Sequence, residues 1–431
     1  MSATTVDTAT PDAAASGDVL RTKSWKGPIG LGAVALISLL VFGIGTPSGA
    51  DTTFSVATSS DFVHLPTLTI ASKLAAIVLS VIALALAGYS AYLANQYRKP
   101  GLWLPIVYGM AVMGALLSWA GAGRDNTSIQ VTGLLTSSLF LAVPLIFGAL
   151  AGTLCERSGI VNIAIEGQLL AGAFFAALMA SMVGNAYVGL IAAPLAGALV
   201  GAVLAIFATK YWVNQIVVGV VLNMLVIGLT SFFFSTVMSD NPDLNRSLGL
   251  AALPIPLLSS IPVLGPVLFD QNLLVYTMYV VVIVFQIMLF KSRWGLRVRA
   301  VGEHPKAADT VGIKVNRTRV RNTILGGAIA GLGGAFFTVA SGLAFGKEMT
   351  AGKGYIALAA MILGRWSPRG ALAAALLFGF ADALRVQLGI IGSDIPSQFL
   401  AMFPYLATIF AVAGLVGHSR PPAAEGIPYK K

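Results

Sequence analysis

The sequence predicts an all-α protein that crosses a membrane many times, and two observations carry this prediction. Of the 431 residues, 57% are hydrophobic and only 10% are charged, with a mean hydropathy of +0.85, whereas soluble domains carry about 25% charged residues. The hydrophobic residues also gather in runs, many of which reach the roughly 20 residues that a helix needs to cross a bilayer. The expected architecture is a polytopic membrane protein with about 10–12 transmembrane helices.

About twelve apolar segments are the candidates for these helices. In chain order they lie near 27–46, 69–96, 101–120, 130–154, 161–183, 186–209, 213–238, 272–290, 320–343, 354–365, 369–389 and 397–417. Short basic loops fall on one side of the membrane if both termini are cytoplasmic, and this is the predicted topology. The segment 354–365 is short for a span, so a half-helix is expected there.

Two stretches outside the clear spans need their own interpretation. Residues 1–26 form an N-terminal tail that is rich in Ala, Thr, Ser and Asp and is expected to be disordered and cytoplasmic. The apolar run that begins at Gly27 is interpreted as a signal anchor that stays in place. The stretch 153–162, TLCERSGIVN, is either a cytoplasmic loop or a break in a helix, which is tolerated in a membrane only against protein or water.

Residues 291–321 concentrate the charge of the chain and are expected to form one long basic loop with a helix in it. They hold nine Lys/Arg and two Asp/Glu, a net charge of +7, compared with +10 for the whole protein. Inside this stretch, HPKAADTVGI predicts one short helix, because Pro305 suits a first turn and Gly312 a helix end. Such a helix is marginal alone, so its smooth face at Ala307 and Ala308 is expected to dock on a partner. A solvated loop that only sets topology is the alternative.

A second polar group lies in SGIVNIAIEGQ, residues 158–168. Asn162 and Glu166 are four residues apart and would share one helical face. Because an apolar run follows Glu166, its carboxylate is expected inside the membrane region, where it marks a functional site by default. A structural ion pair with Arg157, or a carboxylate stabilised at a helix start, is the alternative.

Three further features are weaker candidates. Asn223 is a buried amide that either bonds a neighbouring helix or lines a substrate path. Phe174 belongs to a group of phenylalanines that either pack in the core or stack on a planar substrate. Asp382 lies three residues before Arg385 on one predicted helix, and the two are expected to pair.

Several chemistries are excluded by the residues that are missing. Cys155 is the only cysteine and the three histidines are scattered, so neither a disulfide nor a metal site is predicted. The sequence holds no phosphate-binding P-loop, no H-E-x-x-H and no G-x-S-x-G. The chain is therefore expected to be no enzyme and to need no cofactor, and its basic excess sets topology instead of binding nucleic acid.

Three motifs give the chain a family resemblance. ERSGIVNIAIEG (156–167), RAVGEHPKAADTVGI (299–313) and MTAGKGYIALAAMILGRWSP (349–368) resemble the permease subunits of bacterial nucleoside and simple-sugar ABC importers, a branch related to the ribose and branched-chain amino acid permeases. The resemblance covers about 130–417 and implies a permease core over 121–418 with a cytoplasmic tail over 419–431. The first three spans, 27–120, lie outside it and are interpreted as an N-terminal extension.

The resemblance also implies partners and site residues. The expected partners are a second homologous permease, a cytoplasmic ABC ATPase and an extracytoplasmic substrate-binding lipoprotein, assembled in the bacterial cytoplasmic membrane. The stretch 299–313 would hold a coupling helix that enters a groove of the ATPase, with candidate residues Gly302, Glu303, Pro305, Ala307, Ala308 and Gly312. The candidates for the substrate path are Asn162, Glu166, Asn223 and Phe174.

The function that these observations favour is nucleoside import driven by ATP hydrolysis in partner subunits. Import of a simple sugar such as ribose or galactose is the alternative within the same class. A proton-coupled secondary transporter, with Glu166 and Asp382 as a relay, is a second alternative that would not need the docking helix. A membrane enzyme acting on lipid-linked sugar would need an acidic cluster, and the sequence contains none.

Overall fold

The computed structural model divides the chain into two compact units, which are made of Met1–Asp51 with Ala71–Ala122 and of Thr52–Ile70 with Gly123–Lys431. The structure describes residues 25–56, 61–62, 66–98, 100–101, 103–124, 128–246, 248–392, 398–399, 401–402, 405 and 420–430. Most of the predicted tail at 1–26 and of the predicted span at 397–417 lies outside these residues. The assignment of 27–120 as an N-terminal extension stays a prediction.

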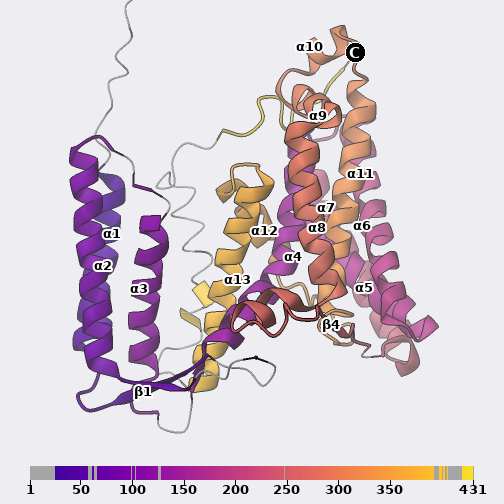
Figure 1. Ribbon diagram of the computed structural model, residues 1–431. Helices are drawn as coiled ribbons and strands as arrows, with labels where there is room; N and C mark the ends of the chain where they lie inside the picture. Colours follow the sequence, from indigo (N-terminus) through magenta and orange to yellow (C-terminus); the bar gives the residue numbers. More distant parts are fainter. Residues whose placement is uncertain are drawn as a thin grey trace, which may run out of the picture. The chain divides into compact units, whose positions relative to one another are not determined.

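The first unit is a bundle of three helices that lie side by side (Figure 1). They are α1 (Lys26–Ile37), which continues as the π-helical segment η1 (Ser38–Ile44), α2 (Ser72–Asn95) and α3 (Trp103–Ala120). Small buried side chains line their contacts, and they include Ala35, Ala83, Ala87 and Ala111. Small residues let helix backbones approach closely. The hydroxyls of Ser38 and Ser80 add a buried hydrogen bond of 2.8 Å.

Within the described residues, ten helices of the second unit have defined bounds. They are α4 (Val131–Arg157), α5 (Ile165–Val183), α6 (Ala186–Thr209), α7 (Gln215–Phe233), α8 (Leu273–Lys291), α9 (Arg293–Glu303), α10 (Pro305–Thr310), α11 (Val315–Gly334), α12 (Lys353–Leu363) and α13 (Pro368–Ile391). Short helical segments join them: η2 (Phe234–Met238), η3 (Pro242–Leu244), η4 (Gly265–Phe269) and η5 (Ala335–Phe337).

The strands are short. β1 (Asp51–Ser55) lies between β2 (Leu68–Ala71) and β3 (Ile129–Gln130), and its pairing with β3 is parallel. β4 (Ala252–Pro254) and β5 (Asp270–Asn272) form an antiparallel pair. In the part of the chain that the structure describes, the five strands lie in loops between helices, so its architecture is all-α.

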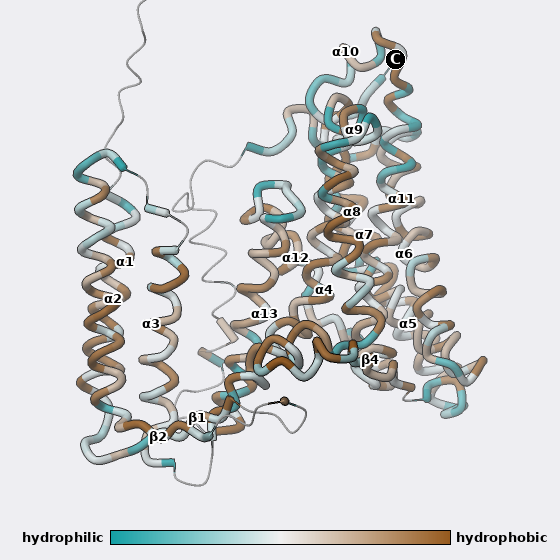
Figure 2. The backbone as a smooth tube through the Cα atoms, viewed as in Figure 1, coloured by the Kyte–Doolittle hydropathy of each residue, from teal (hydrophilic) through white to brown (hydrophobic). Residues whose placement is uncertain are grey.

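Within the described residues, nine helices are long and apolar enough to cross a membrane: α1 with η1, α2, α3, α4, α5, α6, α7 with η2, α8 and α13. Figure 2 shows their hydrophobic middles and the hydrophilic stretch at α9 and α10. The predicted polytopic all-α fold is confirmed. The short helix expected at 354–365 is confirmed as well, because α12 has only 11 residues.

Two predictions about helices need correction. The span predicted at 320–343 is the helix α11, which begins at Val315 and ends at Gly334. A Cβ at Gly334 would lie 2.1 Å from the carbonyl oxygen of Leu169, so the chain passes close to α5 there and continues into η5. The basic stretch 291–321 is not one long loop either. Its first part is the amphipathic helix α9, which buries Val298 and Val301.

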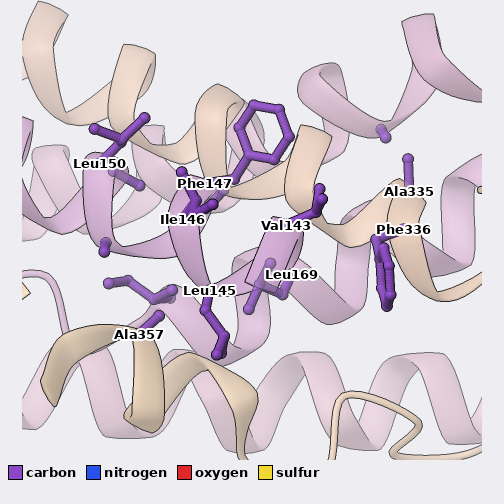
Figure 3. Close-up of a cluster of buried hydrophobic side chains, with 14 of the residues drawn as sticks. Val143, Leu145, Ile146, Phe147, Leu150, Leu169, Ala335, Phe336 and Ala357 are labelled. Atoms are coloured by element: carbon purple, nitrogen blue, oxygen red, sulfur yellow. The ribbon is translucent and has the colours of Figure 1, made fainter. Parts of the chain in front are cut away.

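The core of the second unit is built around α4. Figure 3 shows Leu145, Ile146, Phe147 and Leu150 of this helix among side chains of α5, η5 and α12, and all four are fully buried. A helix that is buried on every side is expected to be hydrophobic all round. α4 is therefore a central helix of this unit, and α5, α11, α12 and α13 pack against it.

α6 and α11 cross at glycines. A Cβ on Gly197 would lie 2.2 Å from the carbonyl oxygen of Gly327, and a Cβ on Gly331 would lie 2.3 Å from that of Ala193. Real side chains do not tolerate such distances, so only glycine permits this approach. This contact fixes α11, which carries the basic residues of the charge-rich stretch at its start.

Candidate functional site

The connection between α4 and α5 is a buried break in the helical path. α4 ends at Arg157 and α5 begins at Ile165. Between them, Ser158 and Asn162 are completely buried, and Gly159 has a φ of +92°. This connection is packed against protein, which is where non-helical backbone is tolerated in a membrane. The two interpretations of 153–162 both stay predictions.

The Glu166 carboxylate connects this break to α12. It accepts hydrogen bonds from the Thr350 hydroxyl at 2.6 Å and from the backbone N–H of Gly352 at 2.9 Å. Its second oxygen accepts the N–H of Gly354 at 2.6 Å. Because Glu166 also lies in the first turn of α5, one carboxylate stands at the N-terminal ends of two helices. Negative charge is favoured at that end of a helix dipole.

Asn162 does not share a helical face with Glu166, because residues 158–164 are not helical. The prediction of a common face is therefore wrong. Asn162 instead exchanges two hydrogen bonds with Gln168, at 3.0 and 3.2 Å, and its amide nitrogen lies 3.5 Å from the Cys155 sulfur. Gln168 is fully buried and was not predicted. The pair ties the break to the second turn of α5.

Asn223 of α7 holds the other side of the break. Its amide nitrogen donates to the carbonyl of Ile163 at 2.9 Å and to the hydroxyl of Tyr355 at 3.2 Å. Its oxygen accepts the backbone N–H of Gly167 at 2.8 Å. The side chain thus bonds α5, the break and α12 at once. The sequence analysis does not predict the role of Tyr355, a residue of α12 that lies 132 positions after Asn223 in the chain.

Phe174 lies in an aromatic cluster. Its ring meets Phe345 edge-on with centroids 5.2 Å apart, and Phe233 of α7 is 6.3 Å away. Phe174 and Phe345 are buried, whereas Phe233 is 42% exposed. The Lys347 ammonium group lies 5.8 Å above the ring of Phe234. The structure thus places Phe174 where α5, α7 and the segment before α12 meet.

The ion pair of Asp382 has a different partner from the predicted one. Asp382 of α13 accepts a hydrogen bond from the ammonium group of Lys353 at the start of α12. Arg385 was the expected partner because it lies three residues further along the same helix. The tertiary contact between α12 and α13 brings Lys353 closer. Lys353 lies between Gly352 and Gly354, whose backbone N–H groups donate to the Glu166 carboxylate.

The second group of candidate residues lies at one end of the second unit. We call this the basic end, formed by α9, α10, the first turns of α11 and residues 420–430. The predicted short helix is confirmed as α10, with Pro305 in its first turn and Gly312 just after its end at a φ of +85°. Ala307 is exposed, but Ala308 is buried against Val301, Val315 and Tyr429. Of the smooth face expected at the two alanines, only Ala307 is therefore available to a partner.

The three motifs of the sequence meet at Arg157. Its guanidinium donates to the carbonyl of Trp366 at 3.0 Å and lies 3.8 Å from the Glu303 carboxylate. A Cβ on Gly302 would lie 2.2 Å from the Arg157 carbonyl oxygen, so the glycine allows α9 to reach the end of α4. The Trp366 indole also donates to Glu156. The end of α4 therefore contacts both the α9–α10 segment and the connection from α12 to α13.

Comparisons with known proteins match this part of the chain. The family model for the permease component of the branched-chain amino acid transport system matches residues 134–416. The guanosine ABC transporter permease protein NupQ of Bacillus subtilis is 39% identical over 319 residues, which cover 70% of this chain and 98% of that protein. The nucleoside ABC transporter permease protein NupC of Lactococcus lactis is 38% identical and covers 69% of this chain and 96% of its own.

A glucose ABC transporter permease protein, TsgB13 of Haloferax volcanii, is 29% identical over 346 residues, 73% of this chain and 89% of its own. No solved structure gives a significant match. The family model covers more than half of the chain and includes the break, α10 and α12. The chain is therefore a multi-pass membrane protein that belongs to the family of permease components of the branched-chain amino acid transport system.

Proposed function

We propose that this chain is the permease subunit of a bacterial ABC importer and that it carries nucleosides across the cytoplasmic membrane. Two relatives align with this chain over nearly their whole length, and one is named for guanosine and the other for nucleosides. The observation that carries the coupling part of the proposal is α10. It is a six-residue helix with an exposed outer face, seated on α9 and α11 at the basic end.

In this proposal the basic end faces the cytoplasm. Lys and Arg are retained on the cytoplasmic side of membrane proteins, and α9 and the start of α11 carry Arg297, Arg299, Arg317 and Arg321. α10 then enters a groove of a cytoplasmic ABC ATPase with Ala307 and Val311 outward, of which Val311 is 75% exposed. A second homologous permease and an extracytoplasmic lipoprotein complete the importer, and ATP is hydrolysed in the ATPase alone.

The substrate path in this proposal runs beside the break. The side chains of Asn162, Glu166 and Asn223 are hydrogen-bonded to protein groups. Their role in this proposal is to hold α5, α7 and α12 together beside the substrate path. Phe174 and Phe345 meet edge-on beside α5 and α7, and Phe233 of the same cluster is 42% exposed. A planar base stacks favourably against aromatic side chains. The aromatic cluster is therefore the proposed contact for the base during passage.

A second candidate substrate is a simple sugar, because the Haloferax volcanii relative is named for glucose. One experiment separates the candidates. The chain is co-expressed with its second permease, ATPase and lipoprotein, reconstituted in liposomes with ATP inside, and tested for uptake of labelled guanosine and labelled glucose. Uptake of guanosine that stops without ATP supports the proposal. Uptake of glucose alone favours the sugar, and uptake driven by a proton gradient without the ATPase would overturn the ABC assignment.

A further inference from the structure

Residues 420–430 form a segment that we call the C-terminal strap. In Figure 1 it is drawn in yellow beside α9, α10 and α11. Its backbone is bonded to the end of α9: the N–H of Ala424 donates to the carbonyl of Gly302 at 2.9 Å, and the N–H of Ala423 donates to the Glu303 carboxylate at 3.2 Å. The strap thus binds directly to the last two residues of α9.

A buried arginine of α11 holds the middle of the strap. The Arg319 side chain is only 1% exposed. Its guanidinium donates to the carbonyl oxygen of Ile427 at 2.8 Å and to that of Ala424 at 3.4 Å. A buried cation is costly unless its donors are satisfied. The strap carbonyls accept from the two terminal nitrogens of Arg319, whereas its Nε has no hydrogen-bond partner among the described residues. The strap therefore offsets part of the cost of burying this cation.

The break between α4 and α5 lies on the other side of Arg319. A Cβ on Gly159 would lie 2.6 Å from the guanidinium, so glycine leaves the room that the arginine occupies. The Glu425 carboxyl of the strap lies beside the Glu156 carboxyl at the end of α4. The strap therefore reaches the break through one carboxyl contact and through the arginine that lies against Gly159.

The end of the strap packs under α10. The Tyr429 ring is buried with Val301, Ala308 and Val315, which come from α9, α10 and α11. The Lys430 ammonium group lies 4.5 Å from the centre of the Trp212 ring, in the connection between α6 and α7. Together these contacts join α10 to α9, α11, the break and α7.

We propose that the C-terminal strap is the positioning element that makes α10 rigid with respect to α11 and the break. A displacement of α10 by the ATPase is then transmitted to the membrane-spanning helices. The coupling part of this inference rests on the proposed function. A six-residue helix is not stable alone and cannot transmit motion unless it is held. The strap provides that hold through Tyr429 under Ala308 and through the bonds to Gly302 and Arg319.

The first test measures the hold itself and needs no transport activity. Spin labels are placed at the exposed positions Lys306 of α10 and Arg369 of α13, with the buried Cys155 replaced by Ser, in the full chain and in a chain that ends at Ser419. Loss of the strap is expected to broaden the distance distribution at least twofold. Tyr429→Ala is expected to broaden it in part, and Ile427→Ala, which removes a side chain that is 55% exposed, is expected to leave it unchanged.

The second test measures coupling in the reconstituted importer. The chain that ends at Ser419 is expected to keep its ATPase partner, and that partner is expected to hydrolyse ATP. Substrate uptake per ATP hydrolysed is expected to fall at least fivefold. A peptide of sequence RPPAAEGIPYKK, added in trans, is expected to restore both the narrow distribution and the uptake, whereas a scrambled peptide is not.

The two tests separate the inference from the proposed function. An unchanged distance distribution in the truncated chain would overturn the strap as a positioning element, whatever is transported. A broadened distribution with full uptake per ATP would overturn its role in coupling. If the full-length chain shows no ATP-driven uptake at all, the proposed function fails, and the distance measurement still decides whether the strap holds α10.

Discussion

The Glu166 carboxylate accepts a hydrogen bond of 2.6 Å from the backbone N–H of Gly354. Through this contact, the second residue of α5 caps the beginning of α12, 188 residues later in the chain. A Cβ on Gly354 would lie 2.4 Å from the Glu166 nitrogen, so the cap needs glycine on one side and a carboxylate on the other. A charge-assisted cap of this kind is stronger than a neutral one.

Replacing Glu166 by Gln is expected to destabilise the protein by about 2 kcal/mol, because a neutral amide offers one acceptor oxygen in place of two and directs N–H groups at backbone donors. Thermal unfolding in detergent measures this loss. Asp240→Asn is the control, since Asp240 is exposed. Equal unfolding temperatures for Glu166→Gln and the unchanged protein would show that the cap contributes nothing.

Replacing Gly331 by Ala is expected to force α6 and α11 apart, because the new Cβ would lie 2.3 Å from the carbonyl oxygen of Ala193. Overpacking of a close contact costs about 1–3 kcal/mol. Gly228→Ala in α7 is the matched control, since a Cβ there meets no atom within 4 Å. Unfolding midpoints of the two variants in detergent are compared. A Gly331→Ala protein as stable as Gly228→Ala would contradict the close crossing.

The sequence alone predicts the spans and the position of α10, because both depend on local patterns. Hydrophobic runs mark the helices, and Pro305 and Gly312 mark the start and end of the short helix. The partners of the polar residues are a different matter. Glu166 binds residues that are 184 to 188 positions away, and Asn223 reaches Tyr355 at 132 positions. No local pattern encodes such contacts.

The errors have the same origin. Asp382 was assigned to Arg385 because the two are neighbours on one helix, yet the packing of α12 on α13 supplies Lys353. The helix α9 looked like loop because its many arginines lower its hydropathy, and only tertiary contacts show that Val298 and Val301 are buried. Residues 420–430 likewise read as a polar tail, although Tyr429 and Glu425 contact distant helices.

The two alanines of α10 are expected to respond differently to the same substitution. Ala307→Glu places a charge on the exposed face, so stability should change by less than about 0.5 kcal/mol, while ATP-driven uptake falls about tenfold, or about 1.4 kcal/mol of docking energy. Ala308→Glu buries a charge against Val301 and Tyr429, and should destabilise the protein by at least about 2 kcal/mol.

Unfolding in detergent and uptake in liposomes together distinguish the two variants of α10. Co-purification of the ATPase with each variant serves as the docking measurement. If Ala307→Glu keeps full uptake and full ATPase binding, the outer face of α10 is not the docking surface. If Ala308→Glu is as stable as the unchanged protein, α10 is not seated as the structure places it.

Stability at the basic end is expected to fall as the pH rises, because of Glu425. Burial raises the pKa of this carboxyl above its usual range, and the Glu156 carboxyl faces it. The folded strap therefore favours the protonated carboxyl, while the unfolded chain ionises near pH 4.3. The stabilisation is complete below that pH and is lost as the pH rises through the higher, folded value of the pKa.

Hydrogen exchange of the Ala423 and Ala424 amides between pH 4 and 8, corrected for intrinsic rates, measures this effect. Protection of the two amides should decrease with pH in the unchanged protein. Glu425→Gln keeps a neutral hydrogen-bonding group opposite Glu156, so it should flatten the pH dependence and raise the protection at pH 8. Asp240→Asn, at an exposed position away from the strap, is the control and should leave the profile unchanged. A profile that stays as steep in Glu425→Gln would mean that another group controls the strap.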